Sequence, residues 1–96
     1  MKQIYKTPQF NKWLTKLRDN KARVVIDKRL KQLETGYYGD YKAIGESVYD
    51  LRFHLNSGYR IYFTERSGEI VVLLAGGDKS SQSRDIKKAI ELSKNI

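Results

Sequence analysis

The feature that most constrains the fold is the stretch of residues 47–79, which contains three strand-like segments in succession. In the first segment Tyr49, Leu51, Phe53 and Leu55 alternate with mostly polar residues, which is the period-two pattern of a strand with one buried face. The run at residues 70–75 is apolar at every position and predicts an inner strand that is covered on both sides. Because turn signals separate the segments, the stretch predicts a three-stranded antiparallel meander.

The first of these turns, at residues 56–58, sets the expected register of the hairpin. Gly58 can adopt the positive φ that short hairpin loops usually require. Pairing across this loop keeps apolar residues on one face and polar residues on the other. The expected pairs are Leu55 with Tyr59, Phe53 with Ile61, Leu51 with Phe63, His54 with Arg60, and Arg52 with Tyr62.

Helical patterns flank the meander. Residues 2–6 predict a short first strand with Ile4 facing inward, and Thr7-Pro8 is typical of a helix start. Apolar residues then recur at helical spacing up to residue 17, and again from residue 22 up to a terminating Gly36. These two helices form a helical hairpin. A last helix, capped by Ser80 or Ser81, completes a single α+β domain over residues 1–96.

Composition narrows the functional classes. The chain has no cysteine and one histidine, which excludes disulfides, thiolate metal sites and histidine-rich metal clusters. No apolar run approaches the length of a membrane span, and the N-terminus lacks the apolar middle of a signal peptide. We therefore expect a cytoplasmic protein that does not contact membranes and needs no metal or cofactor.

The formal net charge of +8 favours a polyanionic partner such as RNA or an acidic protein. Residues 1–36 hold ten basic and three acidic side chains, whereas residues 37–78 hold four and six. The helical hairpin therefore carries most of the positive charge. Three of its residues are candidate RNA contacts, namely Lys12, Lys16 and Arg23.

The polar face of the predicted sheet is the candidate active site. It carries Arg52, His54, Arg60 and Tyr62, and the glycine turn after the last strand brings Lys79 to its end. One interpretation is a solvated face, which antiparallel sheets often have. The other is a catalytic site in which several cations converge on one phosphate.

RNA cleavage without a metal requires removal of a 2′-hydroxyl proton, protonation of the departing 5′-oxygen, and stabilisation of charge on phosphorus. His54 can take or give a proton, and Arg52, Arg60 and Lys79 can stabilise the charge. The turn at residues 76–82 leads into a helix start, where free amides can hold an anion. We expect Gly77 and Gln82 of this turn to contact RNA.

The connector at residues 37–41 contains Tyr37, Tyr38 and Tyr41. Exposed tyrosines can stack on RNA bases, but they can equally pack beneath the helices. The sequence leaves both interpretations open. Trp13, by contrast, lies in the apolar stripe of the first helix and is expected in the core.

Two motifs carry a family resemblance, VYDLRFHLNSGYRIYF and LLAGGDKSSQSRDI. Together with the order of the predicted elements, they resemble the RelE/HigB superfamily of bacterial toxins, and more narrowly its branch of addiction-module killer proteins. By motif, the resemblance implies site positions at Arg52, Arg60, Tyr62, Lys79 and Gln82.

The resemblance implies a RelE-like toxin that cleaves mRNA on the translating ribosome. It also implies an antitoxin partner, usually a helix-turn-helix protein. Because fold alone does not fix function, two alternatives stay open. One is a ParE-like inhibitor of DNA gyrase, and the other is a non-catalytic basic module that binds RNA or protein.

Overall fold

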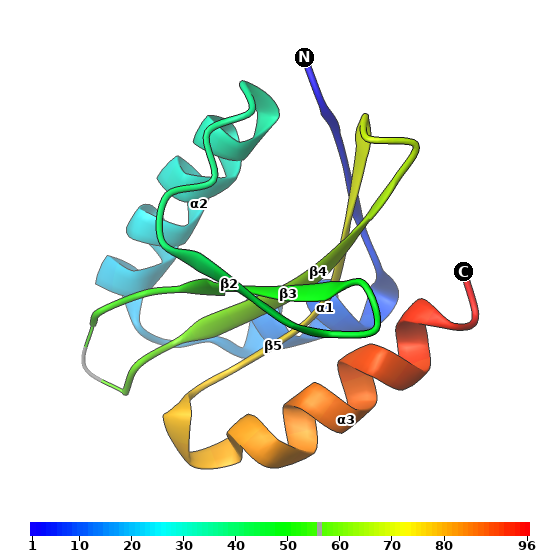
Figure 1. Ribbon diagram of the computed structural model, residues 1–96. Helices are drawn as coiled ribbons and strands as arrows, with labels where there is room; N and C mark the ends of the chain where they lie inside the picture. The colour runs from blue at the N-terminus through cyan, green and yellow to red at the C-terminus, as the bar shows by residue number, and fades with distance from the viewer. Residues whose placement is uncertain (56) are drawn as a thin grey trace.

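The computed structural model describes residues 1–55 and 57–96 and shows a central sheet with helices on both faces (Figure 1). The elements in chain order are β1 (Gln3–Lys6), α1 (Pro8–Lys16), α2 (Asn20–Glu34), β2 (Tyr41–Gly45), β3 (Val48–Arg52), β4 (Arg60–Arg66), β5 (Ile70–Gly77), the 3₁₀ turn η1 (Lys79–Ser81) and α3 (Gln82–Ser93). This order confirms the predicted α+β class with a first strand, a helical hairpin, a meander and a last helix.

The sheet has five strands in the order β1-β5-β4-β3-β2. Strands β2 to β5 form an antiparallel meander, and β1 pairs with β5 in parallel. The sequence did not predict β2, because Tyr41, Lys42 and Ala43 are all exposed at the sheet edge and show no buried face. The predicted meander therefore contains one strand more than expected.

The β3–β4 register differs from the prediction by two residues. Arg52 lies opposite Arg60, and Leu51 lies opposite Ile61. A shift of two residues keeps each side chain on its predicted face, but it widens the loop and moves His54 out of the strand. Gly58 has the predicted positive φ, at 67°, whereas the predicted loop residue Asn56 lies outside the described residues.

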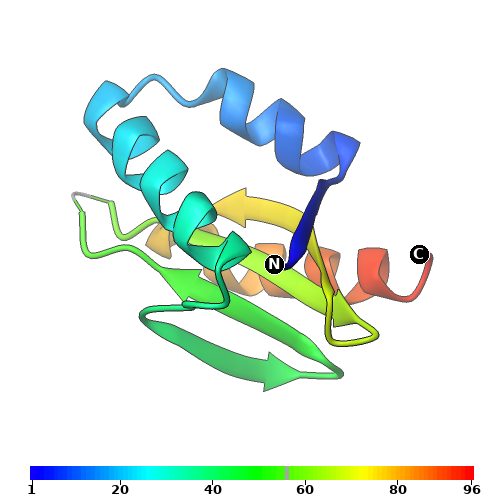
Figure 2. The ribbon, with the colours of Figure 1, turned by 90° about the horizontal axis from the view of Figure 1, so that it is seen from above.

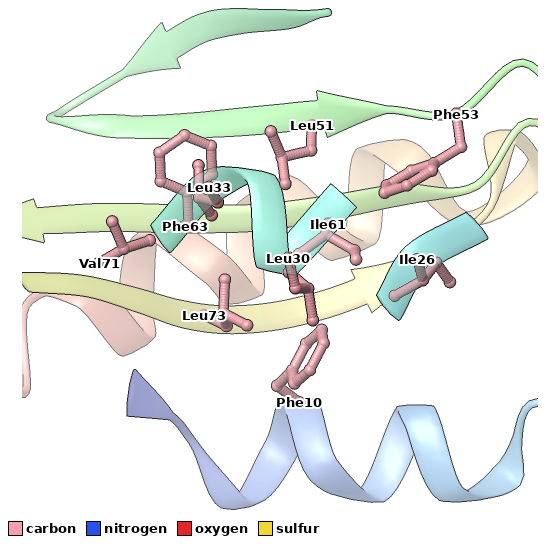
Figure 3. Close-up of a cluster of buried hydrophobic side chains, with 10 residues drawn as sticks. All are labelled: Phe10, Ile26, Leu30, Leu33, Leu51, Phe53, Ile61, Phe63, Val71 and Leu73. Carbon is pink, nitrogen blue, oxygen red and sulfur yellow. The ribbon is translucent and has the colours of Figure 1, made fainter. Parts of the chain in front are cut away.

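The larger core lies between the sheet and the helical hairpin. Phe10 from α1 and Ile26, Leu30 and Leu33 from α2 meet the side chains of β3, β4 and β5 there (Figure 3). Figure 2 shows both helices on this side of the sheet and α3 on the other. Trp13 is half-buried and packs against this core, as predicted.

A smaller core lies beneath α3. Ala89 of α3 packs with Val48, Tyr62, Val72 and Leu74 from three strands. Strand β5 contributes to both cores, which confirms that its uninterrupted apolar run is covered on both sides. Among the described residues, no helix is long and apolar enough to cross a membrane.

Thr7 joins the start of α1 to the sheet. Its Oγ1 accepts a hydrogen bond from the Phe10 amide at 3.2 Å, as a helix cap does, and lies 2.8 Å from the Leu73 carbonyl oxygen. Pro8 is the first residue of α1, as predicted. The buried Thr7 hydroxyl thus serves as both cap and cross-link.

Replacing Thr7 by alanine removes both bonds, so we expect Thr7→Ala to lower the free energy of unfolding by about 1–2 kcal/mol. Thr7→Ser retains the hydroxyl and should keep most of this stability. Urea denaturation of the two variants and the wild type measures the difference. Equal stability of Thr7→Ala and wild type would contradict this role.

Candidate functional site

Four of the five residues predicted to be catalytic line one hollow of about 850 Å³. Arg52 and Arg60 come from the paired ends of β3 and β4, His54 from the loop between them, and Lys79 from the turn after β5. Ser57, Asp78 and Ser80 also line the hollow. The structure therefore brings together Arg52, His54, Arg60 and Lys79, but not Tyr62.

Backbone pairing places Lys79 beside the β3–β4 loop. Gly77, the last residue of β5, lies opposite Arg60 in the ladder. Two residues later the Lys79 amide donates to the Ser57 carbonyl oxygen at 3.0 Å. The turn after β5 is thus tied to the hairpin loop, and the exposed Lys79 side chain lines the same hollow as the two arginines.

Asp50 organises the two arginines. Its side chain is fully buried, and its two carboxylate oxygens lie 3.4 Å from Arg52 Nε and 3.3 Å from Arg60 Nη1. Asp50 and Arg52 are two residues apart and so share a face of β3, while Arg60 lies directly opposite Arg52. One buried negative charge therefore holds two guanidinium groups at the edge of the hollow.

His54 has an acidic partner that sequence reasoning missed. His54 Nε2 lies 2.5 Å from Asp40 Oδ2, and the hydrogen bond from His54 holds the pKa of Asp40 below its usual range. The His54 side chain is 81% exposed, so this contact, rather than packing, orients its ring. Because Asp40 lies fourteen residues before His54, no local sequence pattern indicated the pair.

Arg29 of α2 fixes the backbone around this pair. Its guanidinium donates to the carbonyl oxygens of Arg52 at 2.9 Å, Tyr38 at 3.2 Å and Asp40 at 3.1 Å. It also lies 4.6 Å from the centre of the Phe53 ring. Arg29 therefore positions both the end of β3 and the segment that carries Asp40.

Tyr62 was predicted to be part of the candidate site, but it does not line the hollow. Tyr62 is fully buried beneath α3, and its hydroxyl has no hydrogen-bond partner among the described residues. Burial, with the nearby charges of Asp85 and Asp50, raises the pKa of Tyr62 to about 12. The sequence placed Tyr62 on the correct sheet face, but it did not predict that α3 covers this part of the face.

The turn after β5 differs from the predicted anion site. The amides of Lys79, Ser80 and Ser81 already donate to Ser57 or Asp78. Asp78 caps the 3₁₀ turn η1, and hydrogen bonds from Ser80 lower the pKa of the Asp78 carboxyl. Ser81 is at the N-cap position of α3, as predicted, but its side chain makes no capping hydrogen bond there. An intramolecular carboxylate thus occupies the position proposed for a phosphate.

Two predicted RNA contacts of this turn, Gly77 and Gln82, do not line the hollow. Gly77 is buried, and a side chain added there would overlap Asp85 and Ser81. Its small size is therefore explained by packing. Gln82 begins α3, is half-buried and does not line the hollow.

The three predicted contacts on the helical hairpin also lie elsewhere. Arg23 Nη1 donates to the carbonyl oxygens of Leu14 at 2.6 Å and Leu17 at 3.3 Å, so its guanidinium closes the end of α1. Lys12 and Lys16 are exposed and line a second groove between α1 and α3. The prediction that they bind RNA stays a prediction.

The tyrosines of the connector at residues 37–41 were predicted either to stack on RNA bases or to pack beneath the helices, and the structure shows both packed and exposed tyrosines. Tyr38 packs against the larger core, with its ring centre 5.9 Å from that of Phe63. Tyr37 and Tyr41 remain 61% and 48% exposed. Packing therefore explains the position of Tyr38 and part of that of Tyr41, whose ring centre lies 5.0 Å from that of Tyr38. Tyr37 is the more exposed of the other two and stays available for contacts.

Residues 12–95 match the family described as phage-derived Gp49-like proteins. An uncharacterised Haemophilus influenzae protein is 40% identical over 94 residues, which cover 98% of this chain and 95% of that protein.

Two solved structures share the fold. A chain of the intact Escherichia coli RelBE toxin–antitoxin complex superposes with a TM-score of 0.66, at 21% identity, over 81% of this chain and 96% of its own. A mutant of the E. coli toxin RelE in the free state gives a TM-score of 0.71, at 18% identity, over 94% and 95%. The predicted RelE-like fold is confirmed.

The buried Tyr62 hydroxyl finds no hydrogen-bond partner in the described part of the chain, so removing it should cost no stability. We expect Tyr62→Phe to have the same free energy of unfolding as the wild type, or one higher by about 1 kcal/mol. Thermal and urea denaturation measure this difference. A loss of more than about 1 kcal/mol would show that the hydroxyl makes a stabilising hydrogen bond.

Proposed function

We propose that this chain, which belongs to the Gp49-like family of phage-derived proteins and to the RelE-like toxin superfamily predicted from its sequence, is the toxin of a toxin–antitoxin pair. We infer further that it acts as a metal-independent endoribonuclease, which cleaves mRNA on the ribosome and so inhibits translation.

One observation carries this proposal. Arg52, His54, Arg60 and Lys79 come from three separate parts of the chain and line the same hollow. Positive side chains in a partly enclosed site attract phosphate and stabilise the charge that develops during phosphoryl transfer.

The proposed reaction is an intramolecular transfer within RNA. The 2′-oxygen attacks the adjacent phosphorus while its proton passes to a base, and a new bond from the 2′-oxygen to phosphorus forms. The bond from phosphorus to the 5′-oxygen breaks, and an acid gives that oxygen a proton. The products are a 2′,3′-cyclic phosphate and a free 5′-hydroxyl, and no electrons are exchanged with a cofactor.

The lining residues suit these tasks. Histidine is the side chain that ordinarily exchanges protons near neutral pH, and Asp40 holds the exposed ring of His54 at the hollow. We assign to His54 one of the two proton transfers. Arg52, Arg60 and Lys79 then stabilise the negative charge on the phosphoryl oxygens.

The proposed toxin function also implies a partner protein, the antitoxin. One of the structures with this fold belongs to a toxin–antitoxin complex, which supports an antitoxin as the partner of this chain. We propose that this antitoxin is a helix-turn-helix protein and that the toxin acts in the cytoplasm, where ribosomes and mRNA are present.

Primer extension on mRNA from an in vitro translation mixture tests the activity. We expect the wild type to produce discrete cuts, and His54→Ala and Lys79→Ala each to reduce cleavage by about a hundredfold, as loss of one charge-stabilising or proton-transfer group does. Both side chains are exposed, so these substitutions should leave the fold intact. Lys42→Ala removes an exposed cation on β2 and is the matched control.

Two outcomes would contradict the proposal. Cleavage by His54→Ala combined with Lys79→Ala at the wild-type rate would remove these residues from the reaction. Growth arrest on induction without any cut in mRNA would favour a binding toxin such as a gyrase inhibitor, and gyrase supercoiling assays would then identify it.

A further inference from the structure

A second groove is lined by residues of α1, α3 and β5, and both helices pack against β5. The two helices lie on opposite faces of the sheet (Figure 2). The groove has a volume of about 730 Å³ and shares no lining residue with the hollow that contains Arg52 and Arg60. The proposed RNA cleavage makes no use of this groove. Its lining residues differ from those of the hollow and indicate a different ligand.

The floor of the groove is apolar. The Trp13 indole lies so close to Gly76 of β5 that a methyl group at Gly76 would overlap the ring. The Trp13 ring also packs against the core, with its centre 5.9 Å from that of the Phe10 ring. Trp13 is therefore a fixed part of the floor and not a free platform for stacking.

The walls of the groove are cationic. Lys12 and Lys16 are one helical turn apart on α1, and Arg84 and Lys88 are one turn apart on α3. All four are exposed, and none makes an ion pair or hydrogen bond with another described residue. The groove also contains one acid, Asp85, which accepts a hydrogen bond from Ser81. Its single negative charge leaves the four positive charges in excess.

We propose that this groove binds an acidic amphipathic helix of a partner protein. Side chains one turn apart on a helix lie about 6 Å from one another, so carboxylates at that spacing match the pairs of cations on both walls. An apolar side chain between them can cover Trp13 and Gly76, as in helix-in-groove recognition. An RNA backbone would use the cations but would gain nothing from the apolar floor.

This inference goes beyond the proposed nuclease activity, because it concerns a surface that the reaction does not use. Binding of a helix in this groove does not require that the chain cleave RNA. Conversely, the His54 and Lys79 variants that test cleavage leave the groove unchanged, so the two proposals can fail separately.

The only tryptophan of the chain is Trp13, so its fluorescence reports directly on the groove. The probe is a synthetic amphipathic helical peptide with glutamates one turn apart and leucines between them. We expect a saturable change in Trp13 fluorescence, and binding about tenfold weaker for the same peptide with glutamine in place of glutamate. A short uridine oligonucleotide serves as the competing ligand.

Charge reversal on the two walls provides the decisive comparison. Lys12→Glu combined with Lys88→Glu should weaken peptide binding by about tenfold or more. Lys28→Glu combined with Lys42→Glu changes the net charge equally on exposed positions outside the groove and should have little effect.

Three outcomes would overturn the proposal. The first is no saturable fluorescence change with the glutamate peptide. The second is an equal effect of the wall and control variants. The third is tighter binding of the oligonucleotide than of the peptide at Trp13, which would assign Lys12 and Lys16 to RNA.

Discussion

The contact of Asp50 with Arg52 and Arg60 is the interaction on which the candidate site depends. An unpaired charge within the sheet would be costly, and breaking a buried ion pair typically costs about 3–5 kcal/mol. Asp50 is fully buried, and each of its oxygens faces one guanidinium. The arginines are therefore held by the sheet itself and keep their places at the hollow without a bound ligand. Arg29 supports the same edge from the other face, through the Arg52 carbonyl oxygen.

The sheet separates the two surfaces that we propose to be functional. At the ends of β3 and β4, past the cover of α3, the polar face is open and carries the hollow. Further along the same face, α3 covers Tyr62 and Val48 and excludes solvent. At the β5 side, α1 and α3 form the cationic groove over Trp13 and Gly76. Catalysis and partner binding would thus use separate parts of one small domain.

Much of the fold was predictable because its signals are local. Alternation in β3 and β4, the apolar run of β5 and the Thr7-Pro8 helix start all depend on neighbouring residues. The register of the β3–β4 hairpin was not predictable, because a shift of two residues satisfies the same alternation of apolar and polar side chains. Strand β2 was missed since an exposed edge strand has no apolar face to detect. Arg52, His54, Arg60 and Lys79 were grouped correctly around one hollow. Two of their supports, Asp40 and Arg29, are distant in the chain from the residues they hold, and no local motif indicates such contacts. The burial of Tyr62 depends on where α3 packs, which alternation within a strand does not reveal.

The most direct test of the central claim is the rate of RNA cleavage by Asp50→Asn, measured as kcat/KM at a temperature where circular dichroism shows the variant folded. This change keeps the shape of the side chain and removes the charge that orients the arginines. We expect a loss of about a hundredfold, because misplacing charge-stabilising groups by an ångström costs about that much. We expect no further loss when the change is added to Arg52→Ala and Arg60→Ala. A folded Asp50→Asn variant that cleaves RNA at the wild-type rate would contradict the central claim.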